Sequence, residues 1–242
     1  MRISAKSFVV SAAISLLATS GGPAAHAGLV MSAEAPGVQT STVAGVITET
    51  FNSFGTGQYS SLQTAVGVLS TSGSLAIVSA DIYGGAGGTG NYFALGAQSG
   101  SALPVTLTFS RPESYFGLDW SAADANNTIT FYSGTNAIAT FNDASAFSFT
   151  TPGDAYYGNP NNGGDPGEPF AYLNFNGTDG STFTSVVFSN NGTTGTGFEA
   201  DNFSIGNVPE PSSLVLGSMA SAICALALWR RNRRARSAKS FT

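Results

Sequence analysis

The central part of the sequence predicts an all-β fold, and more narrowly a β-sandwich of the jelly-roll type. Aromatic and β-branched residues recur there in short bursts, and apolar and polar residues alternate within several of them, as at Val105, Leu107 and Phe109. This period of two is typical of a strand with one buried face. Turn dipeptides such as Asn191-Gly192 separate the bursts and accept the positive φ that tight hairpins need. No helical period competes with this pattern.

The predicted strands are short and follow one another closely. They are Val46–Phe51, Ser74–Ser79, Asn91–Leu95, Pro104–Ser110, Ser114–Trp120, Thr128–Ser133, Ala137–Phe141, Phe147–Thr150, Phe170–Asn176, Thr182–Ser189 and Gly197–Gly206. The spans 84–90 and 153–167 between them are rich in glycine and polar residues. A long polar loop in a compact domain is either functional or mobile.

The first 27 residues have the pattern of a secretory signal peptide. Arg2 and Lys6 give a positive start, and an apolar run follows over residues 8–18. That run is too short to span a bilayer. Ala25 and Ala27 supply the small residues at which signal peptidase cuts. We therefore expect export, with a single β-domain over residues 28–207.

The C-terminal end, residues 208–236, combines a chain break, an apolar run and a basic cluster. Pro209, Glu210 and Pro211 cannot continue a strand or a helix, because proline lacks the N–H and fixes φ. A transmembrane helix is predicted over residues 213–229. The basic tail that follows contains Arg230, Arg231, Arg233, Arg234 and Arg236. Such a cluster stays on the cytoplasmic side, so the rest of the chain is expected outside.

A signal peptide combined with this tail resembles the PEP-CTERM proteins of bacteria, whose tail is also called the ice-binding protein C-terminal domain. The resemblance covers Val208 to about Arg236. It implies processing near the Pro-Glu-Pro motif by exosortase, a membrane enzyme. The expected location is a membrane-anchored precursor, followed by the cell surface or the extracellular matrix.

Charge and residue usage exclude several classes of function. Between residues 28 and 207, one basic residue (Arg111) faces thirteen acidic ones, which gives a net charge near −12. A field of this sign repels nucleic acid, so we expect no nucleic-acid partner. The same span contains no histidine and no cysteine. Thiol nucleophiles, Ser-His-Asp triads and ordinary zinc sites are therefore excluded there.

Residues 115–132 contain a first candidate site. They resemble a subgroup of exosortase-dependent surface proteins in which a tryptophan strand precedes a polar loop. Trp120, Asp124 and Asn127 occupy these positions, and an aromatic ring beside carboxylate and amide groups is suited to bind carbohydrate. The alternative is structural: Trp120 is in phase with Phe116 and Leu118 and belongs to the core, and the polar pair shapes a turn.

Residues 197–211 contain a second candidate, because the Ala-Asp-Asn-Phe-Ser-Ile run resembles the last strand of calcium-bearing jelly rolls. Asp201 is in phase with Phe203, so its carboxylate is expected on the core side. A buried carboxylate needs a partner. Calcium, which takes oxygen ligands, is one prediction, and a hydrogen-bonded or solvated Asp201 is the other. The further candidate ligands are Glu199 and, from an adjacent first strand, Glu49 and Asn52.

Three functions remain open from the sequence. The favoured one is a non-catalytic surface or matrix protein that binds exopolysaccharide weakly. The second is a carbohydrate-active enzyme using paired carboxylates. The loop residues Asp154, Asp165 and Glu168 are the candidates for its acid and base. The alternative is that these residues belong to a mobile, solvated loop. The third is an adhesin that stays in the membrane through its C-terminal helix.

Overall fold

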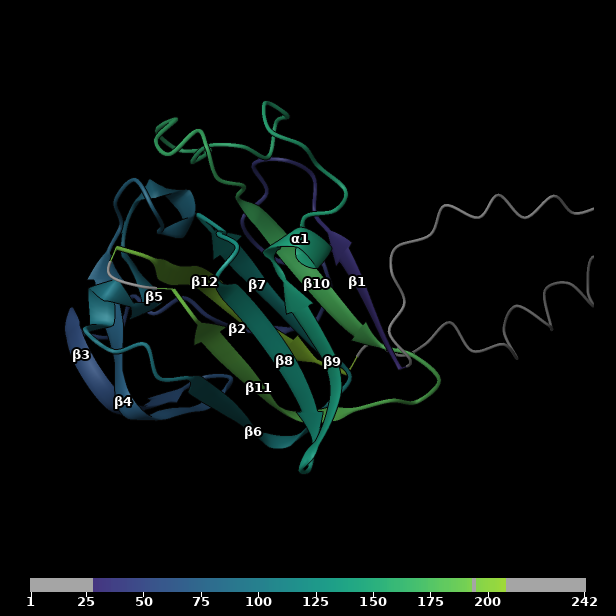
Figure 1. The fold of residues 1–242 in the computed structure, drawn as a ribbon. Helices are drawn as coiled ribbons and strands as arrows, with labels where there is room; N and C mark the ends of the chain where they lie inside the picture. Colours follow the sequence, from purple (N-terminus) through teal and green to yellow (C-terminus); the bar gives the residue numbers. More distant parts are fainter. Residues whose placement is uncertain (1–27, 193–194, 208–242) are drawn as a thin grey trace, which may run out of the picture.

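The computed structural model describes residues 28–192 and 195–207. This part of the chain is almost entirely β (Figure 1). The strands are β1 (Leu29–Ala33), β2 (Ile47–Glu49), β3 (Gly57–Thr64), β4 (Gly67–Ser79), β5 (Asn91–Gly96), β6 (Val105–Glu113), β7 (Tyr115–Ser121), β8 (Asn127–Ser133), β9 (Asn136–Asn142), β10 (Ala171–Gly177), β11 (Phe183–Asn190) and β12 (Gly197–Gly206). The helical turns are η1 (Ala86–Gly88), η2 (Ala97–Ser99) and α1 (Asp143–Ala146).

All strands join one antiparallel sheet in the order β1-β10-β7-β12-β5-β4-β6-β11-β8-β9, with β2 added to β12 and β3 added to β4. The sheet curls into a nearly closed shape, so that its two halves face each other (Figure 1). We call β1, β10, β7, β12 and β5 the first layer, and β6, β11, β8 and β9 the second layer. From β5 to β12 the chain passes repeatedly from one layer to the other.

Strand β4 joins the two layers. Its C-terminal part, Ala76–Ser79, pairs with β5 in the first layer. Its N-terminal part, Val68–Ser70, pairs with β6 in the second layer. A strand of 13 residues is long enough to change partners along its length, which is why the two layers remain one hydrogen-bonded sheet.

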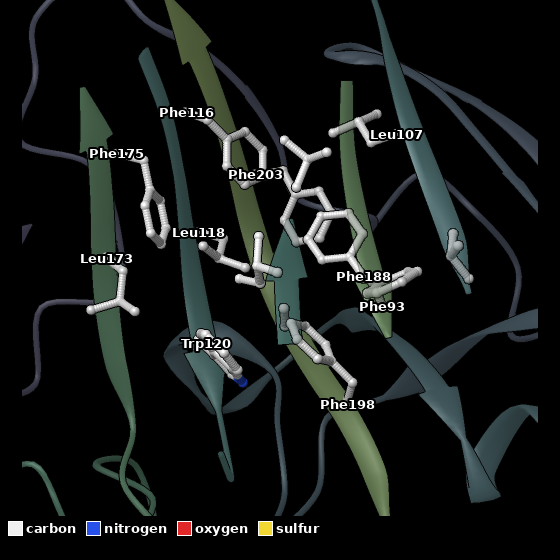
Figure 2. Close-up of a cluster of buried hydrophobic side chains, with 14 of the residues drawn as sticks. Phe93, Leu107, Phe116, Leu118, Trp120, Leu173, Phe175, Phe188, Phe198 and Phe203 are labelled. Atoms are coloured by element: carbon white, nitrogen blue, oxygen red, sulfur yellow. The ribbon is translucent and has the colours of Figure 1, made fainter. Parts of the chain in front are cut away.

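The core between the layers is dominated by phenylalanine rings (Figure 2). Phe188 of β11 stacks on Phe203 of β12 with ring centroids 5.2 Å apart. Phe131 of β8 lies 4.9 Å from Phe175 of β10. Both pairs connect the second layer to the first, and these inward positions are fully buried. Aromatic pairs of this kind add about 0.5–1.5 kcal/mol to the gain from burial alone.

The opposite face of the first layer is also buried, but it is polar. We call the following set the outer polar layer: Tyr115, Asp119, Tyr172, Asn174, Asp201 and Ser204. Segment 34–46, which follows β1, covers it. Gln39 Nε2 donates to Asp119 Oδ2 at 3.0 Å, and the hydroxyl groups of Ser41 and Tyr115 lie 2.6 Å apart. Because these groups pair with one another, their burial is tolerated.

Most predicted strands are confirmed with shifts of a few residues at their ends, but Phe147–Thr150 is wrong. In the structure α1 ends at Ala146 and a turn follows. The Asn142 side chain accepts from Ser145 N, and Ser145 Oγ accepts from Asn142 N, which is a reciprocal cap. Phe147 and Phe149 alternate with polar residues as they would in a strand, and this pattern led to the wrong prediction. Strands β1 and β3 and the first half of β4 were not predicted.

Candidate functional site

Asp201 lies on the outer face of β12, which corrects the prediction that it points to the core side. The pairing of β12 with β7 shifts register between Asp201 and Ser204. Asn202 takes a positive φ of 50° at this irregularity. The alternation therefore slips by one residue, so Phe203 points inward and Asp201 points outward, opposite Asp119 in the register of β7.

Hydrogen bonds compensate the Asp201 carboxylate, as one of the two predicted alternatives requires. Its Oδ2 accepts from Ala86 N at 2.9 Å and its Oδ1 from Asn202 N at 2.7 Å. Burial is the main cause that raises the pKa of Asp201 to about 7. The neighbouring Asp119 is buried as well, and burial together with Asp201 raises its pKa well above the usual range.

The other predicted calcium ligands do not form a metal site with Asp201. The predicted pairing of the Glu49 strand with the last strand is confirmed, because Glu49 lies opposite Phe203. The Glu49 carboxylate, however, accepts from Phe51 N and Ala65 N, and Asn52 Oδ1 accepts from Asn91 N. Within the described ranges, no group of three or more Asp, Glu, His or Cys side chains could hold a metal ion.

Trp120 is a core residue, which confirms the structural alternative and not the carbohydrate-binding one. The side chain is fully buried, and its ring stacks on Phe198 at 4.9 Å (Figure 2). Asn127 is fully buried too, and its Oδ1 accepts from Asn190 Nδ2. Asp124 forms the predicted turn by accepting from Asn126 N at 2.7 Å. Of the three residues, Asp124 lines the pocket described next, and Trp120 and Asn127 do not.

That pocket lies where the loops that follow β4, β5 and β7 meet the start of β12. We call it the end pocket; its volume is about 160 Å³. Its lining includes Tyr83, Gln98, Asp124, Glu168, Thr196 and Glu199. It brings together three carboxyl groups that the sequence analysis had assigned to three separate candidate sites. Asp154 of the acidic loop does not line it and instead caps a turn by accepting from Thr151 N.

Glu199 is the most buried of these carboxyl groups, with 4% of its surface exposed. Its Oε1 accepts from Gln98 Nε2 at 2.8 Å, and Gln98 Oε1 accepts in turn from the Tyr92 hydroxyl at 3.1 Å. This chain of bonds fixes the Gln98 amide and aims the Glu199 carboxyl into the pocket. Burial, and then the nearby Glu168 and Asp124, raise the pKa of Glu199 well above its usual range.

Glu168 enters the end pocket from the long loop before β10. Burial, the neighbouring Asp165 and the more distant Asp124 raise the pKa of Glu168 to about 8. Like-charged carboxyl groups that share a site disfavour one another's ionised forms. With a pKa of about 8, the Glu168 carboxyl group is therefore mostly protonated at neutral pH.

Tyr83 and Gln98 are pocket residues that the sequence analysis missed. Tyr83 is 43% exposed, and its backbone N–H donates to Asp81 Oδ1 at 2.8 Å. An exposed tyrosine flanked by the glycines at 84 and 85 was a visible signal in the sequence. Gln98 carried no such signal, because only the pairing of β12 with β5 brings it beside Glu199.

No family model, curated protein or solved structure matches this chain. The predicted signal peptide, including Ala25 and Ala27, lies outside the described residues. So do the motif at 209–211, the transmembrane helix predicted over 213–229 and the arginine cluster at 230–236. In the part of the chain that the structure does describe, none of the helices has the length and apolar character needed to cross a membrane.

Proposed function

We propose that this chain is an exported, non-catalytic protein of a bacterial surface or extracellular matrix, and that its β-domain binds polysaccharide in the end pocket. The observation that carries the proposal is the composition of this pocket. It combines an exposed aromatic ring, a positioned amide and three carboxyl groups in about 160 Å³. Rings stack on the faces of sugars, and amide and carboxyl groups bond to their hydroxyls, which is the usual make-up of a small-ligand site.

The order of the strands supports a jelly-roll class for the domain. Four first-layer strands lie in the order β5-β12-β7-β10, and four second-layer strands in the order β6-β11-β8-β9. Eight strands in two sheets linked by Greek-key connections define a jelly roll, an architecture found in lectin domains. This is an analogy of fold, and it adds to the argument from the pocket without replacing it.

The sequence ends support the export part of the proposal. The sheet occupies residues 29–206, which fits between the predicted cleavage after Ala27 and the predicted tail from residue 208. Signal peptidase and exosortase are the proposed processing partners, and the membrane holds the precursor through its C-terminal segment. Exopolysaccharide is the proposed ligand outside the cell.

An extracellular glycosidase is the second candidate, because carboxyl groups with raised pKa values share one pocket. Such an enzyme needs one protonated and one ionised carboxyl group. The pKa values of Glu168 and Glu199 move in the same direction, upward. The two groups therefore do not divide the roles of acid and base, and binding is favoured over catalysis. Release of reducing sugar from any retained polymer, lost in Glu168→Gln, would reverse this preference.

Retention by polysaccharide tests the binding proposal. We expect the full chain to be slowed in affinity electrophoresis by at least one polymer from a panel of neutral, amino-substituted and uronate polysaccharides. Tyr83→Ala should weaken that retention about three- to tenfold, because it removes the stacking ring. Phe149→Ala is the matched control, since Phe149 is 42% exposed and does not line the pocket. Failure of every polymer to retain the chain would contradict the proposal.

Mass spectrometry of the protein recovered from its native host tests the sorting proposal. We expect a chain that begins near Gly28 and ends near Pro211. A chain that keeps its C-terminal arginines and stays in the membrane fraction would favour the adhesin instead.

A further inference from the structure

The end pocket contains acidic groups but no basic side chain. Arg111 is the only lysine or arginine between residues 28 and 207. Its Nε donates to Glu113 Oε1 at 2.9 Å, so it is engaged on β6. Three carboxyl groups therefore line the pocket without a lysine or arginine of the described chain beside them. A uronate or phosphate group on a ligand would add a further negative charge and be repelled.

Glu199 also has an unused acceptor that faces the pocket. Its Oε1 is bonded to Gln98, whereas Oε2 has no hydrogen-bond donor from residues 28–192 or 195–207. The side chain is more than nine-tenths buried and lines the pocket. Oε2 is not one of the buried oxygen atoms without a partner, so it is accessible to a donor that enters the pocket.

We propose that the end pocket selects polysaccharide whose sugars carry free amino groups, with the ammonium group placed against Glu199, in a pocket whose lining also carries Glu168 and Asp124. This inference rests on the proposed polysaccharide binding and names the substrate class. An ammonium group supplies up to three donors and a positive charge, which are the two features that the pocket lacks. Tyr83 offers its ring to the sugar, and Gln98 and Thr196 border the same space.

A sugar amine fits this pocket better than a metal ion or a simple polyamine does. The described acidic side chains are not arranged to hold a metal ion. A polyamine would satisfy the carboxyl groups but would have no use for the exposed Tyr83 ring, whereas a hexosamine has a ring face for stacking and hydroxyls for the amide. Placement of an ammonium beside Glu168 and Glu199 favours their ionised forms, so binding should release protons.

Isothermal titration calorimetry of the full chain with a glucosamine trimer and with its N-acetylated counterpart tests the inference. At about pH 6 an amine of this kind carries its proton. We expect the free-amine trimer to bind about ten- to hundredfold more tightly, the worth of one charge-assisted hydrogen bond. Its binding heat should also differ between buffers of different ionisation enthalpy, which reports proton release.

Two variants and one matched control sharpen this test. Glu199→Gln should remove most of the preference for the free amine. Glu168→Gln, at a half-buried position, should reduce this preference, and it replaces Glu199→Gln as the test if that variant does not fold. Asp179→Asn makes the same change of charge at an exposed turn and should leave affinity unchanged. Thermal melts of each variant establish that it is folded.

The outcomes separate this inference from the proposed function. Equal binding of the two trimers, or retention only by polymers without amines, would overturn the amine preference and leave polysaccharide binding in place. Binding of trilysine as tightly as of the amine trimer would also overturn it, because general charge attraction would then suffice. If no saccharide of any class binds, both proposals fail.

Discussion

The two faces of the first layer are both buried, yet they are built on opposite principles. The inner face of β7 and β12 packs phenylalanine and tryptophan rings against the second layer. The outer face of the same strands carries Asp119 and Asp201, which bond to segment 34–46 and to the residues around η1. The gain from burying apolar surface is non-directional, whereas each buried carboxyl group depends on particular donors at particular distances.

This difference predicts two kinds of sensitivity in one sheet. The inner face should respond to changes of volume and be almost indifferent to pH. The outer face should respond to pH and to the loss of single donors. Three substitutions and one change of pH compare the faces, from the largest expected effect to the smallest.

Loss of one inner ring should have the largest effect. Phe203 contacts the rings of Phe51, Phe93, Phe116 and Phe188 at centroid distances between 5.1 and 5.6 Å. Phe203→Ala leaves a cavity and should lower the free energy of unfolding by about 3–5 kcal/mol. Urea denaturation measures this. The exposed Phe149, changed to alanine, should cost about 1 kcal/mol or less, and equal costs at the two sites would contradict the assignment of the core.

Acidification should stabilise the domain through the outer face and the end pocket. The pKa is about 7 for Asp201 and about 8 for Glu168, against ordinary values of 3.8 and 4.5. The folded state then binds more protons than the unfolded state between about pH 4.5 and pH 8. Stability should therefore fall as pH rises through this window, by up to about 1.4 kcal/mol per pH unit for the buried Asp201 and by less for the half-exposed Glu168, whose charge is screened by solvent.

Asp119→Asn isolates the contribution of the outer face. An amide at this position can still accept from Gln39 and can donate to Asp201, as a protonated Asp119 would. We expect a gain in unfolding free energy at pH 8, little change at pH 5, and a flatter dependence between them. The measurement is chemical denaturation at each pH. A wild-type stability that rises from pH 5 to pH 8 would contradict the raised pKa values.

The smallest of these effects should follow removal of one donor from the outer face. Gln39 Nε2 donates to Asp119, and Gln39 Oε1 accepts from Gly87 N at 2.9 Å. Gln39→Ala leaves a buried carboxyl group short of a partner, with an expected cost of about 1–3 kcal/mol. Amide hydrogen exchange at Gly87 should also become faster. Gln58→Ala, at an exposed position, serves as control, and equal costs at the two sites would sink the idea that segment 34–46 holds this face.

The inner face could be predicted from the sequence and the outer face could not. The alternation of Phe116, Leu118 and Trp120 identified core positions on β7, and the structure confirms them. The same alternation failed at Asp201, because the slip at Asn202 reverses the faces of the strand. A period of two holds only while the register holds, and one extra residue is enough to invert it.

Strands with few apolar residues were missed for a related reason. β3 reads GQYSSLQT and has only two buried positions, Leu62 and Thr64, so no hydrophobic period marks it. The end pocket was predicted only in fragments. Asp124, Glu168 and Glu199 were each named from their own stretch of sequence, but their meeting depends on the order of strands in the sheet, which local patterns do not contain.

The long strand β4 has a consequence for how the domain comes apart. Because its two ends belong to different layers, neither layer can leave the other without unzipping a ladder that both share. We therefore expect the two layers to separate together and not one at a time. The end pocket, which is formed by loops of this sheet, should be as rigid as the sheet itself. The ligand proposed for this pocket would therefore meet a site that is already formed, and little ordering would be needed when it binds.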